Sequence, residues 1–468
     1  MKNQLCKENN NIPTSIFKAY DIRGIVNEDL TPEIVYSIGQ ALGSESQEFH
    51  HQKNIVVGRD GRLSGKDLSH ALIEGLQNSG CHIIDIGLVP TPILYFATYF
   101  LETGAGIMVT GSHNPPNYNG LKMILGGNTL ALEAIQRLRQ RIENKNYLYG
   151  TGSVKILDVI PSYLQKITAD IKLFRSLKII VDCGSGAAGE VAPYLYRAMG
   201  NEVIELYCDI DGHFPHHHPD PSQPENLKDL IRKVKEEKAD IGFAFDGDGD
   251  RLGVVDSKGN IIWPDRQLML YAKDVVSRNP KAIILYDVKC SRHLDLIIKS
   301  AGGSPMMYKT GHSLIKAKMK ETDALLAGEM SGHIFFKERW YGFDDALYTG
   351  ARLLEILAKN TKNSAEVFDE LPNDISTPEI RVNMAEGTHF QFMEKLLLQA
   401  KYPSDTKIIS IDGLRVEFKD GWGLVRPSNT TPSLILRFEA DNAVALERIK
   451  NTFKEFILQV DPELILSF

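Results

Sequence analysis

The sequence has 468 residues, of which 43% are hydrophobic and 24% are charged, and its net charge is −7. This balance is typical of a folded globular protein and excludes collagen-like, low-complexity and wholly disordered chains. No apolar run approaches the ~18 residues that cross a bilayer, and the slight acidic excess argues against a broad nucleic-acid-binding surface. We therefore expect neither a membrane nor a nucleic acid as a partner.

The chain begins with a polar segment (MKNQLCKENNN) that lacks the apolar centre of a signal peptide. Its five cysteines are scattered and form no CxxC pair. This spacing favours reduced thiols over a disulfide framework or a zinc site. Both features predict a cytoplasmic protein.

Short β-branched runs alternate with helical patterns over most of the chain. The clearest pairs of strand and helix are expected at 54–58 with 67–79, 178–182 with 187–199, and 282–287 with 293–301. A strand that leads through a polar turn into a helix is typical of α/β units. Three such units in series predict three similar α/β domains with mixed sheets.

The last hundred residues follow a different pattern, with short strands and a terminal amphipathic helix. The strands are expected at 379–383, 413–418, 423–426 and 433–440, and the helix at 442–459. A hairpin signal at 419–421 favours an antiparallel sheet, and so an α+β domain. Turn-rich seams divide the chain into domains at 1–157, 158–260, 261–372 and 373–468.

The first motif that could carry chemistry is TGSHNPP, at 110–116, which follows an expected strand. A serine in such a rigid turn, here Ser112, can act as a nucleophile or carry a phosphate. His113 is adjacent, but neighbouring loop side chains often point apart, so a Ser–His dyad is not implied. The absence of GxSxG argues against an α/β-hydrolase. A plain Ser/Asn-rich turn is the alternative.

A second motif, DGDGDR, places Asp246, Asp248 and Asp250 at alternate positions after an expected strand. Three anions packed together need a hard cation, so Mg²⁺ or Ca²⁺ is expected. An EF-hand is excluded because Arg251 and Ser257 occupy the positions that its loop needs for Gly and Glu. The histidine-rich segment 211–226 lacks the helical spacing of a metal site and is expected to be a long loop.

Two further turns carry groups suited to sugars and phosphates. In GEMSGH, Glu329 and Ser331 have the spacing to face one side and bind hydroxyls. The turn RPSNTT offers a guanidinium, hydroxyls and an amide, a set typical of a phosphate site. Its candidate residues are Arg426, Ser428, Asn429 and Thr430. Ordinary turns are the alternative at both places.

Taken together, these stretches resemble the α-D-phosphohexomutase superfamily, and most closely its bacterial phosphomannomutase/phosphoglucomutase branch. The matching segments, in the family's order, are FKAYDIRG, TGSHNPPNYNGLKM, DGDGDR, YDVKCS, KTGHSLIK, GEMSGH and RPSNTTP. The resemblance spans essentially the whole chain. It implies four domains around a central cleft, and an isomerase of carbohydrate metabolism that interconverts hexose 1-phosphates and hexose 6-phosphates.

The resemblance also assigns roles to individual residues. Ser112 would carry the phosphate and, with the three aspartates, complete a Mg²⁺ site. Glu329 and Ser331 would bind the sugar hydroxyls, and the RPSNTT turn the phosphate that does not react. The residues near the reacting group would be Arg23, Lys122, Arg251 and His333, and further substrate contacts would come from Tyr20, Lys289 and His312.

The implied mechanism passes a phosphoryl group from Ser112 to the substrate through a hexose 1,6-bisphosphate, which also serves as activator. Lys122 is the first candidate for general base and His333 the second, since a lysine among cations and near a metal is expected to have a lowered pKa. Hexose phosphates are the expected partners, and a monomer is expected. Phosphoglucosamine mutase is the runner-up, but that branch usually has Gln where this chain has Met330. A non-catalytic sugar-phosphate sensor is disfavoured by the intact Ser112.

Overall fold

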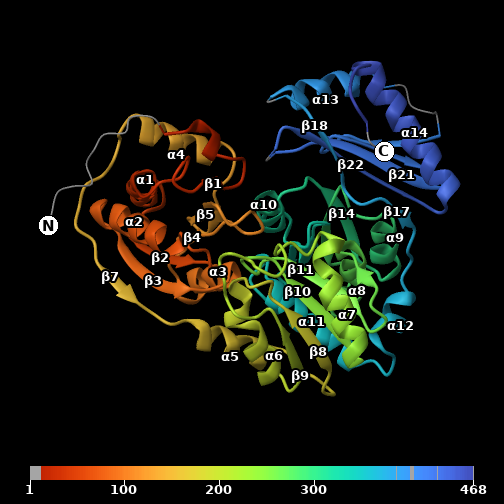
Figure 1. Ribbon diagram of the computed structural model, residues 1–468, viewed down its shortest axis with the longest axis horizontal. Helices are drawn as coiled ribbons and strands as arrows, with labels where there is room; N and C mark the ends of the chain where they lie inside the picture. Colours follow the sequence, from red (N-terminus) through yellow and green to blue (C-terminus); the bar gives the residue numbers. More distant parts are fainter. Residues whose placement is uncertain (1–11, 386, 401–404, 430, 467) are drawn as a thin grey trace.

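The computed structural model describes residues 12–385, 387–400, 405–429, 431–466 and 468. Four sheets follow one another along the chain (Figure 1). The first three are mixed and covered by helices, and the last is antiparallel. This confirms the predicted fold class of three α/β domains followed by an α+β domain. In those same ranges, no helix has both the length and the apolar character needed to cross a membrane.

A seven-stranded mixed sheet forms the first domain. Its elements are a 3₁₀ helix (Thr14–Ile16), β1 (Ile22–Ile25), α1 (Pro32–His50), β2 (Asn54–Arg59), α2 (Gly65–Asn78), β3 (His82–Leu88), α3 (Thr91–Phe100), β4 (Gly106–Val109), β5 (Tyr118–Leu125), β6 (Asn128–Thr129), α4 (Glu133–Glu143) and β7 (Val154–Ile156). The strand order is β1-β5-β4-β2-β3-β7, with β6 beside β5. The central strand β2 is parallel to both of its neighbours and buries Ile55, Val56 and Val57, as a strand covered on both faces requires.

The second domain has a five-stranded sheet in the order β12-β11-β10-β8-β9. Its elements are α5 (Ile160–Asp170), β8 (Lys178–Asp182), a 3₁₀ helix (Ala187–Glu190), α6 (Ala192–Ala198), β9 (Glu202–Leu206), a 3₁₀ helix (Pro224–Leu227), α7 (Lys228–Glu237), β10 (Ile241–Phe245), β11 (Leu252–Asp256) and β12 (Ile261–Ile262). The continuous helix predicted at 187–199 is wrong. It is divided because Pro193 has no N–H to continue a helix and instead lies in the first turn of α6.

The third domain contains a four-stranded sheet in the order β14-β13-β15-β16. Its elements are α8 (Pro264–Arg278), β13 (Ile283–Asp287), α9 (His293–Ser300), β14 (Ser304–Tyr308), α10 (His312–Thr322), β15 (Leu326–Gly328), β16 (Ile334–Phe336), α11 (Ala346–Ala358) and α12 (Ser364–Asp369). Strand β13 is parallel to β14 and β15, whereas β16 is antiparallel to β15. The turn between β15 and β16 therefore lies at the same edge of the sheet as the carboxyl end of β13.

The last domain has an antiparallel sheet in the order β17-β22-β21-β20-β19, with β18 beside β22. Its elements are β17 (Ile375–Ser376), β18 (Ile380–Asn383), α13 (Thr388–Gln399), β19 (Lys407–Ile409), β20 (Leu414–Phe418), β21 (Gly421–Pro427), β22 (Ser433–Ala440) and α14 (Ala443–Val460). The predicted hairpin is confirmed, since Phe418 pairs with Gly421 across β20 and β21. Figure 1 shows this domain (blue) beside the third, with β17 near α9.

One apolar core continues through the first three domains. The ring of Phe96 on α3 stacks on Trp340 of the third domain and makes an edge contact with Tyr163 on α5 of the second. All three side chains are buried. The strand ends of these domains are therefore held in a common packing arrangement, which brings their loops together.

Candidate active site

Ser112 lies between β4 and β5. We call residues 110–118, which include the first residue of β5, the serine loop. The backbone of Ser112 has a φ of +47°, a conformation that costs energy for any residue with a Cβ. The side chain is only 2% exposed. Its hydroxyl donates a hydrogen bond to Asp246 at 2.9 Å. The loop thus directs Ser112 toward the second domain.

His113 lies closer to Ser112 than the sequence implied. The Oγ atom of Ser112 is 3.1 Å from Nδ1 of His113, so the expectation that these neighbours point apart is wrong. Burial, reinforced by the nearby Arg251 guanidinium, holds the pKa of His113 well below its usual value. The lowered pKa favours the neutral imidazole, which adjoins the serine hydroxyl.

The three aspartates after β10 form the acidic loop (residues 246–250). All three side chains are fully buried, and each has an oxygen within 4.8 Å of an oxygen of the other two. Burial and the charges of Asp250 and Asp248 raise the pKa of Asp246 well above its usual value. Within the described part of the chain, Oδ1 of Asp248 and Oδ1 of Asp250 have no hydrogen-bond partner. This set of converging hard oxygen donors fits Mg²⁺.

Lys122 on β5 reaches across to the acidic loop. Its Nζ lies 2.7 Å from Asp248 and 2.5 Å from Asp250. Burial alone would lower the pKa of Lys122. The charges of these two carboxylates have a larger and opposite effect, so the pKa lies well above its usual value. The predicted lowering of this pKa presumes a metal ion beside the lysine, whereas the two carboxylates act in the opposite direction.

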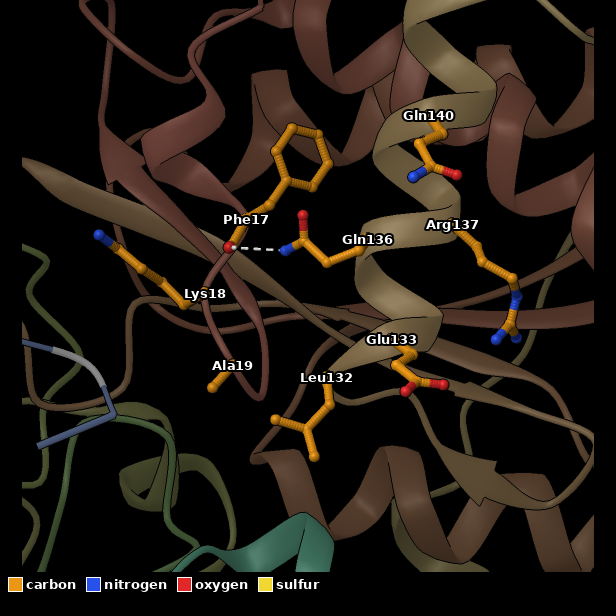
Figure 2. Close-up of a pocket in the computed structure, with 8 residues that line it drawn as sticks. All are labelled: Phe17, Lys18, Ala19, Leu132, Glu133, Gln136, Arg137 and Gln140. Carbon is orange, nitrogen blue, oxygen red and sulfur yellow. Dashed lines mark hydrogen bonds between the residues drawn. The ribbon is translucent and has the colours of Figure 1, made fainter. Parts of the chain in front are cut away.

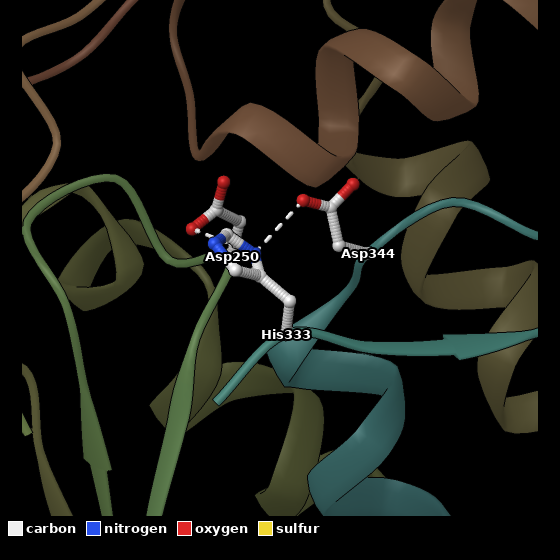
Figure 3. Close-up of side chains that lie close together, drawn as sticks. All are labelled: Asp250, His333 and Asp344. Atoms are coloured by element: carbon white, nitrogen blue, oxygen red, sulfur yellow. Dashed lines mark ion pairs between the residues drawn. The ribbon is translucent and has the colours of Figure 1, made fainter. Parts of the chain in front are cut away.

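Figure 3 shows His333 between two buried carboxylates. Its Nδ1 lies 2.9 Å from Asp344 and 3.7 Å from Asp250. On the other side of the ring, Arg251 Nε donates to Nε2 at 3.1 Å. Since Nε2 accepts this bond, the proton of a neutral ring lies on Nδ1, facing Asp344.

Asp344 also forms an ion pair with Lys316 on α10, and the Nζ atom of Lys316 lies 2.8 Å from its carboxylate. Burial alone raises the pKa of Asp344, but the charge of Lys316 and the contact with His333 bring it well below its usual value. His312 lies near the same carboxylate, with Nδ1 at 3.8 Å. Asp344 therefore stays ionised and joins two of the predicted histidines.

The turn between β15 and β16 positions Glu329, which is buried. Its Oε1 accepts a hydrogen bond from Gly311 N at 2.5 Å, and burial raises its pKa. Ser331 lies in the same turn and is half-buried. Lys289, in the loop after β13, forms an ion pair with Glu379 at 3.0 Å.

The loop after β21 contacts the first domain directly. Asn429 Nδ2 donates to the hydroxyl of Tyr20 at 2.5 Å, and this hydroxyl donates to the carbonyl oxygen of Thr310 at 3.2 Å. Burial raises the pKa of Tyr20 to about 12. Near the end of β21, Arg426 Nε donates to Asp412 at 3.0 Å, and Ser428, the first residue of the loop, is buried. Residues of the first, third and fourth domains therefore meet at Tyr20.

Arg23 on β1 lies beside the serine loop. One nitrogen of its guanidinium is bonded to Asn114, and another lies 2.5 Å from Asp21. The predicted residues therefore form two groups. The group around the acidic loop comprises Ser112, Lys122, Arg251 and His333. The group around Tyr20 includes Asn429. Thr430 lies outside the described residues.

Comparison with known proteins identifies the family. Four profiles described as phosphoglucomutase/phosphomannomutase, alpha/beta/alpha domains I, II and III and C-terminal domain, match residues 14–148, 161–259, 263–375 and 379–456. The chain belongs to this family. A phosphomannomutase/phosphoglucomutase of Pseudomonas aeruginosa is 56% identical over 98% of both chains. The predicted family and the predicted class of enzyme are therefore confirmed.

Two solved structures resemble this chain, one at high and one at low sequence identity. A phosphoglucomutase/phosphomannomutase family protein of Burkholderia thailandensis has a TM-score of 0.93 and 52% identity, covering 98% of this chain and all of that one. An N-acetylphosphoglucosamine mutase of Aspergillus fumigatus, solved with GlcNAc-6P and magnesium, has a TM-score of 0.61 and 14% identity over 95% of this chain and 97% of its own. The second shows the shared fold alone.

A surface pocket on the first domain lies apart from the candidate site residues described above. It has a volume of about 460 Å³ and lies between residues 17–19 and α4. Figure 2 shows Gln136 reaching toward Phe17, whose carbonyl oxygen accepts a hydrogen bond at 3.5 Å. None of the predicted site residues lines it.

Two buried groups that adjoin the candidate site belong to none of the sequence motifs. Asp344 lies in an ordinary-looking loop segment before α11, where only the pair of adjacent aspartates could have drawn attention. Arg62 lies in a DGR turn directly after β2, the strand that neighbours β4. Its position at the carboxyl end of a parallel strand is the signal that could have revealed it.

Proposed function

We propose that this chain interconverts hexose 1-phosphates and hexose 6-phosphates of glucose and mannose, with Ser112 as the phosphate carrier. The observation that supports this most strongly is the contact of the Ser112 hydroxyl with the buried acidic loop, at 2.9 Å from Asp246. A hydroxyl beside three carboxylates is a poor site for an anion by itself. It becomes a good one when a divalent cation occupies the same carboxylates.

In the proposed reaction, phosphorylated Ser112 gives its phosphoryl group to the free hydroxyl of a hexose 1-phosphate. The bond from Ser112 Oγ to phosphorus breaks and a bond to the sugar oxygen forms. The sugar hydroxyl gives its proton to a base, and Ser112 Oγ takes up a proton as it leaves. The resulting hexose 1,6-bisphosphate turns end for end, and its other phosphoryl group returns to Ser112. The product is a hexose 6-phosphate, and added hexose 1,6-bisphosphate acts as an activator by rephosphorylating Ser112.

Asp246, Asp248 and Asp250, with an oxygen on Ser112, are the proposed ligands of Mg²⁺. When bound, the ion supplies positive charge that stabilises the phosphoryl group during its transfer. The unpartnered buried oxygens of Asp248 and Asp250 support this assignment. So does the magnesium in the fungal mutase structure, although that likeness concerns the fold.

Basic side chains around the acidic loop are proposed to position and neutralise the reacting phosphate. They are Arg23, Lys122, Arg251 and His333. Lys122 is the first candidate for the base, on the premise that Mg²⁺ bound to Asp248 and Asp250 would offset the charges that raise its pKa in the present arrangement. His333 is the second candidate. The hydrogen bond from Arg251 to Nε2 of His333 supports an oriented imidazole, because it fixes which ring nitrogen carries the proton. The other ring nitrogen, Nδ1, lies 2.9 Å from Asp344.

The opposite end of the substrate is proposed to bind near Tyr20. Arg426, Ser428, Asn429 and Thr430 would hold the phosphate that does not react, and Glu329 and Ser331 the sugar hydroxyls. Further contacts would come from Tyr20, Lys289 and His312. A guanidinium next to hydroxyl and amide groups is well suited to a phosphate. The bond between Asn429 and Tyr20 supports closure of the last domain over the first.

We also propose the domain limits 1–157, 158–260, 261–372 and 373–468, a monomeric state and a cytoplasmic location. The four sheets and the four family profiles support the domain limits. The four described cysteines are free thiols, which supports a reducing compartment.

Phosphoglucosamine mutase remains the second candidate function. Met330, in place of the Gln usual in that branch, favours glucose and mannose phosphates. A coupled assay with glucose, mannose and glucosamine 1-phosphates, each with its hexose 1,6-bisphosphate, tests the choice. We expect turnover of the glucose and mannose substrates. Turnover of glucosamine 1-phosphate alone would refute the proposed substrates.

A further inference from the structure

Arg62 lies directly behind the serine loop and belongs to none of the motifs assigned above. Its guanidinium donates four hydrogen bonds to main-chain carbonyls of that loop. Nη1 donates to Pro115 at 2.6 Å and to Tyr118 at 2.8 Å. Nη2 donates to Ser112 at 2.9 Å and to Asn114 at 2.6 Å. One side chain thus holds the loop from Ser112 to its far end.

Asp60 fixes this guanidinium from the other side. Its Oδ2 lies 3.4 Å from Arg62 Nε and also accepts from the backbone N–H of Gly111 at 3.1 Å. The side chains of the pair are 0% and 1% exposed. A Cβ at Gly111 would lie 2.4 Å from Arg62 Cζ, so a larger residue there would displace the guanidinium. The charge is therefore buried, paired and closely enclosed.

The second domain covers the remaining face of Arg62. The ring of Phe214 lies 5.3 Å from the guanidinium carbon, within the range of a cation–π contact. A Cβ at Gly212 would lie 3.1 Å from Arg62 Cα. Close by, the ring of His218 is bonded to the carbonyl oxygen of His113. The domain that carries the acidic loop thus also encloses the residue that holds the serine loop.

We propose that Arg62 is a positioning residue for phosphoryl transfer, which holds the serine loop so that Ser112 faces the acidic loop. The inference rests on the proposed function. The positive φ of Ser112 persists only where the surroundings enforce it, and four hydrogen bonds from one rigid fork supply that restraint. A lysine at this position keeps the charge but loses the fork.

The test measures the single-turnover rate of phosphoryl transfer to glucose 1-phosphate, normalised to phosphorylated chains. Arg62→Lys should lower this rate by about 100-fold, the effect of misplacing reacting groups by about 1 Å. The KM should stay within about threefold of wild type, because the proposed phosphate-binding residues of the last domain are intact. A loss of stability alone would leave the normalised rate unchanged.

The matched control is Arg352→Lys on α11, which also alters a buried guanidinium. Arg352 is 0% exposed and forms ion pairs with Asp274 and Glu338, away from the serine loop. Its normalised rate should equal that of wild type. Chemical rescue adds a readout specific to the fork: guanidinium chloride at millimolar concentration should restore part of the rate of Arg62→Ala, whereas ammonium chloride should not.

Asp60→Asn tests the same restraint if Arg62→Ala does not fold. It should lower the normalised rate less than Arg62→Lys does, again with little change in KM. Wild-type normalised rates in both Arg62→Lys and Asp60→Asn would overturn the inference. An inactive wild-type enzyme would instead overturn the proposed function, so the two failures are distinguishable.

Discussion

Gly247 of the acidic loop lies directly against the backbone of the serine loop. A Cβ added there would lie 2.3 Å from the carbonyl oxygen of Ser112, whereas ordinary contacts begin at 3.4 Å. Gly247→Ala must therefore push the two loops apart by about 1 Å. A misplacement of this size costs on the order of 100-fold in rate when it separates reacting groups.

The assay is the coupled mutase reaction at saturating Mg²⁺ and hexose 1,6-bisphosphate. Gly247→Ala should lower kcat by about 100-fold with a small change in KM, because the change affects the transfer step and not the distant phosphate. Overpacking of this kind costs about 1–3 kcal/mol of folding stability, so the variant should still fold.

Gly65→Ala at the start of α2 is the matched control. Its added Cβ would lie 3.4 Å from the nearest atom, the carbonyl oxygen of Asp60, which is an ordinary contact. We expect wild-type kcat from this variant. A Gly247→Ala enzyme with kcat within twofold of wild type would refute the idea that close apposition of the two loops is needed.

Two further predictions test the metal and phosphate assignments. Asp248→Asn should raise the Mg²⁺ concentration for half-maximal activity by at least about tenfold, because a carboxylate ligand is lost; an unchanged Mg²⁺ titration would contradict the acidic loop as the metal site. Arg426→Ala should raise KM by roughly 10- to 100-fold, since hydrogen bonds to a charged group contribute about 1.5–3 kcal/mol; an unaltered KM would place the phosphate elsewhere.

The sequence predicted the strands and the loops that follow them with good accuracy, because hydrophobic runs and turn residues are local signals. The strand at Lys178–Asp182 and that at Ser433–Ala440 have the predicted bounds. The acidic loop was also predictable, since strict alternation of Asp and Gly gathers three carboxylates on one short turn. The helix predicted at 187–199 shows the limit of this approach. Its hydrophobic pattern continues across Pro193, but the helix itself is divided there.

Contacts between distant segments could not be predicted in the same way. Asp344 acquires its importance only when the fold brings it to His333 and Lys316. The contact of Lys122 with Asp248 and Asp250 is of the same kind, since the sequence shows which charges exist but not which are nearest. Arg62 bonds to carbonyl oxygens, and every residue has one, so no pattern of side chains marks its partners.

The central claim is that Ser112 carries the phosphoryl group. The most direct measurement is to incubate the protein with hexose 1,6-bisphosphate labelled in its phosphates and to locate the label by peptide mass spectrometry. We expect labelling of Ser112, transfer of that label to a hexose monophosphate added afterwards, and neither labelling nor turnover in Ser112→Ala. Label on another residue, or full turnover by Ser112→Ala, would contradict it.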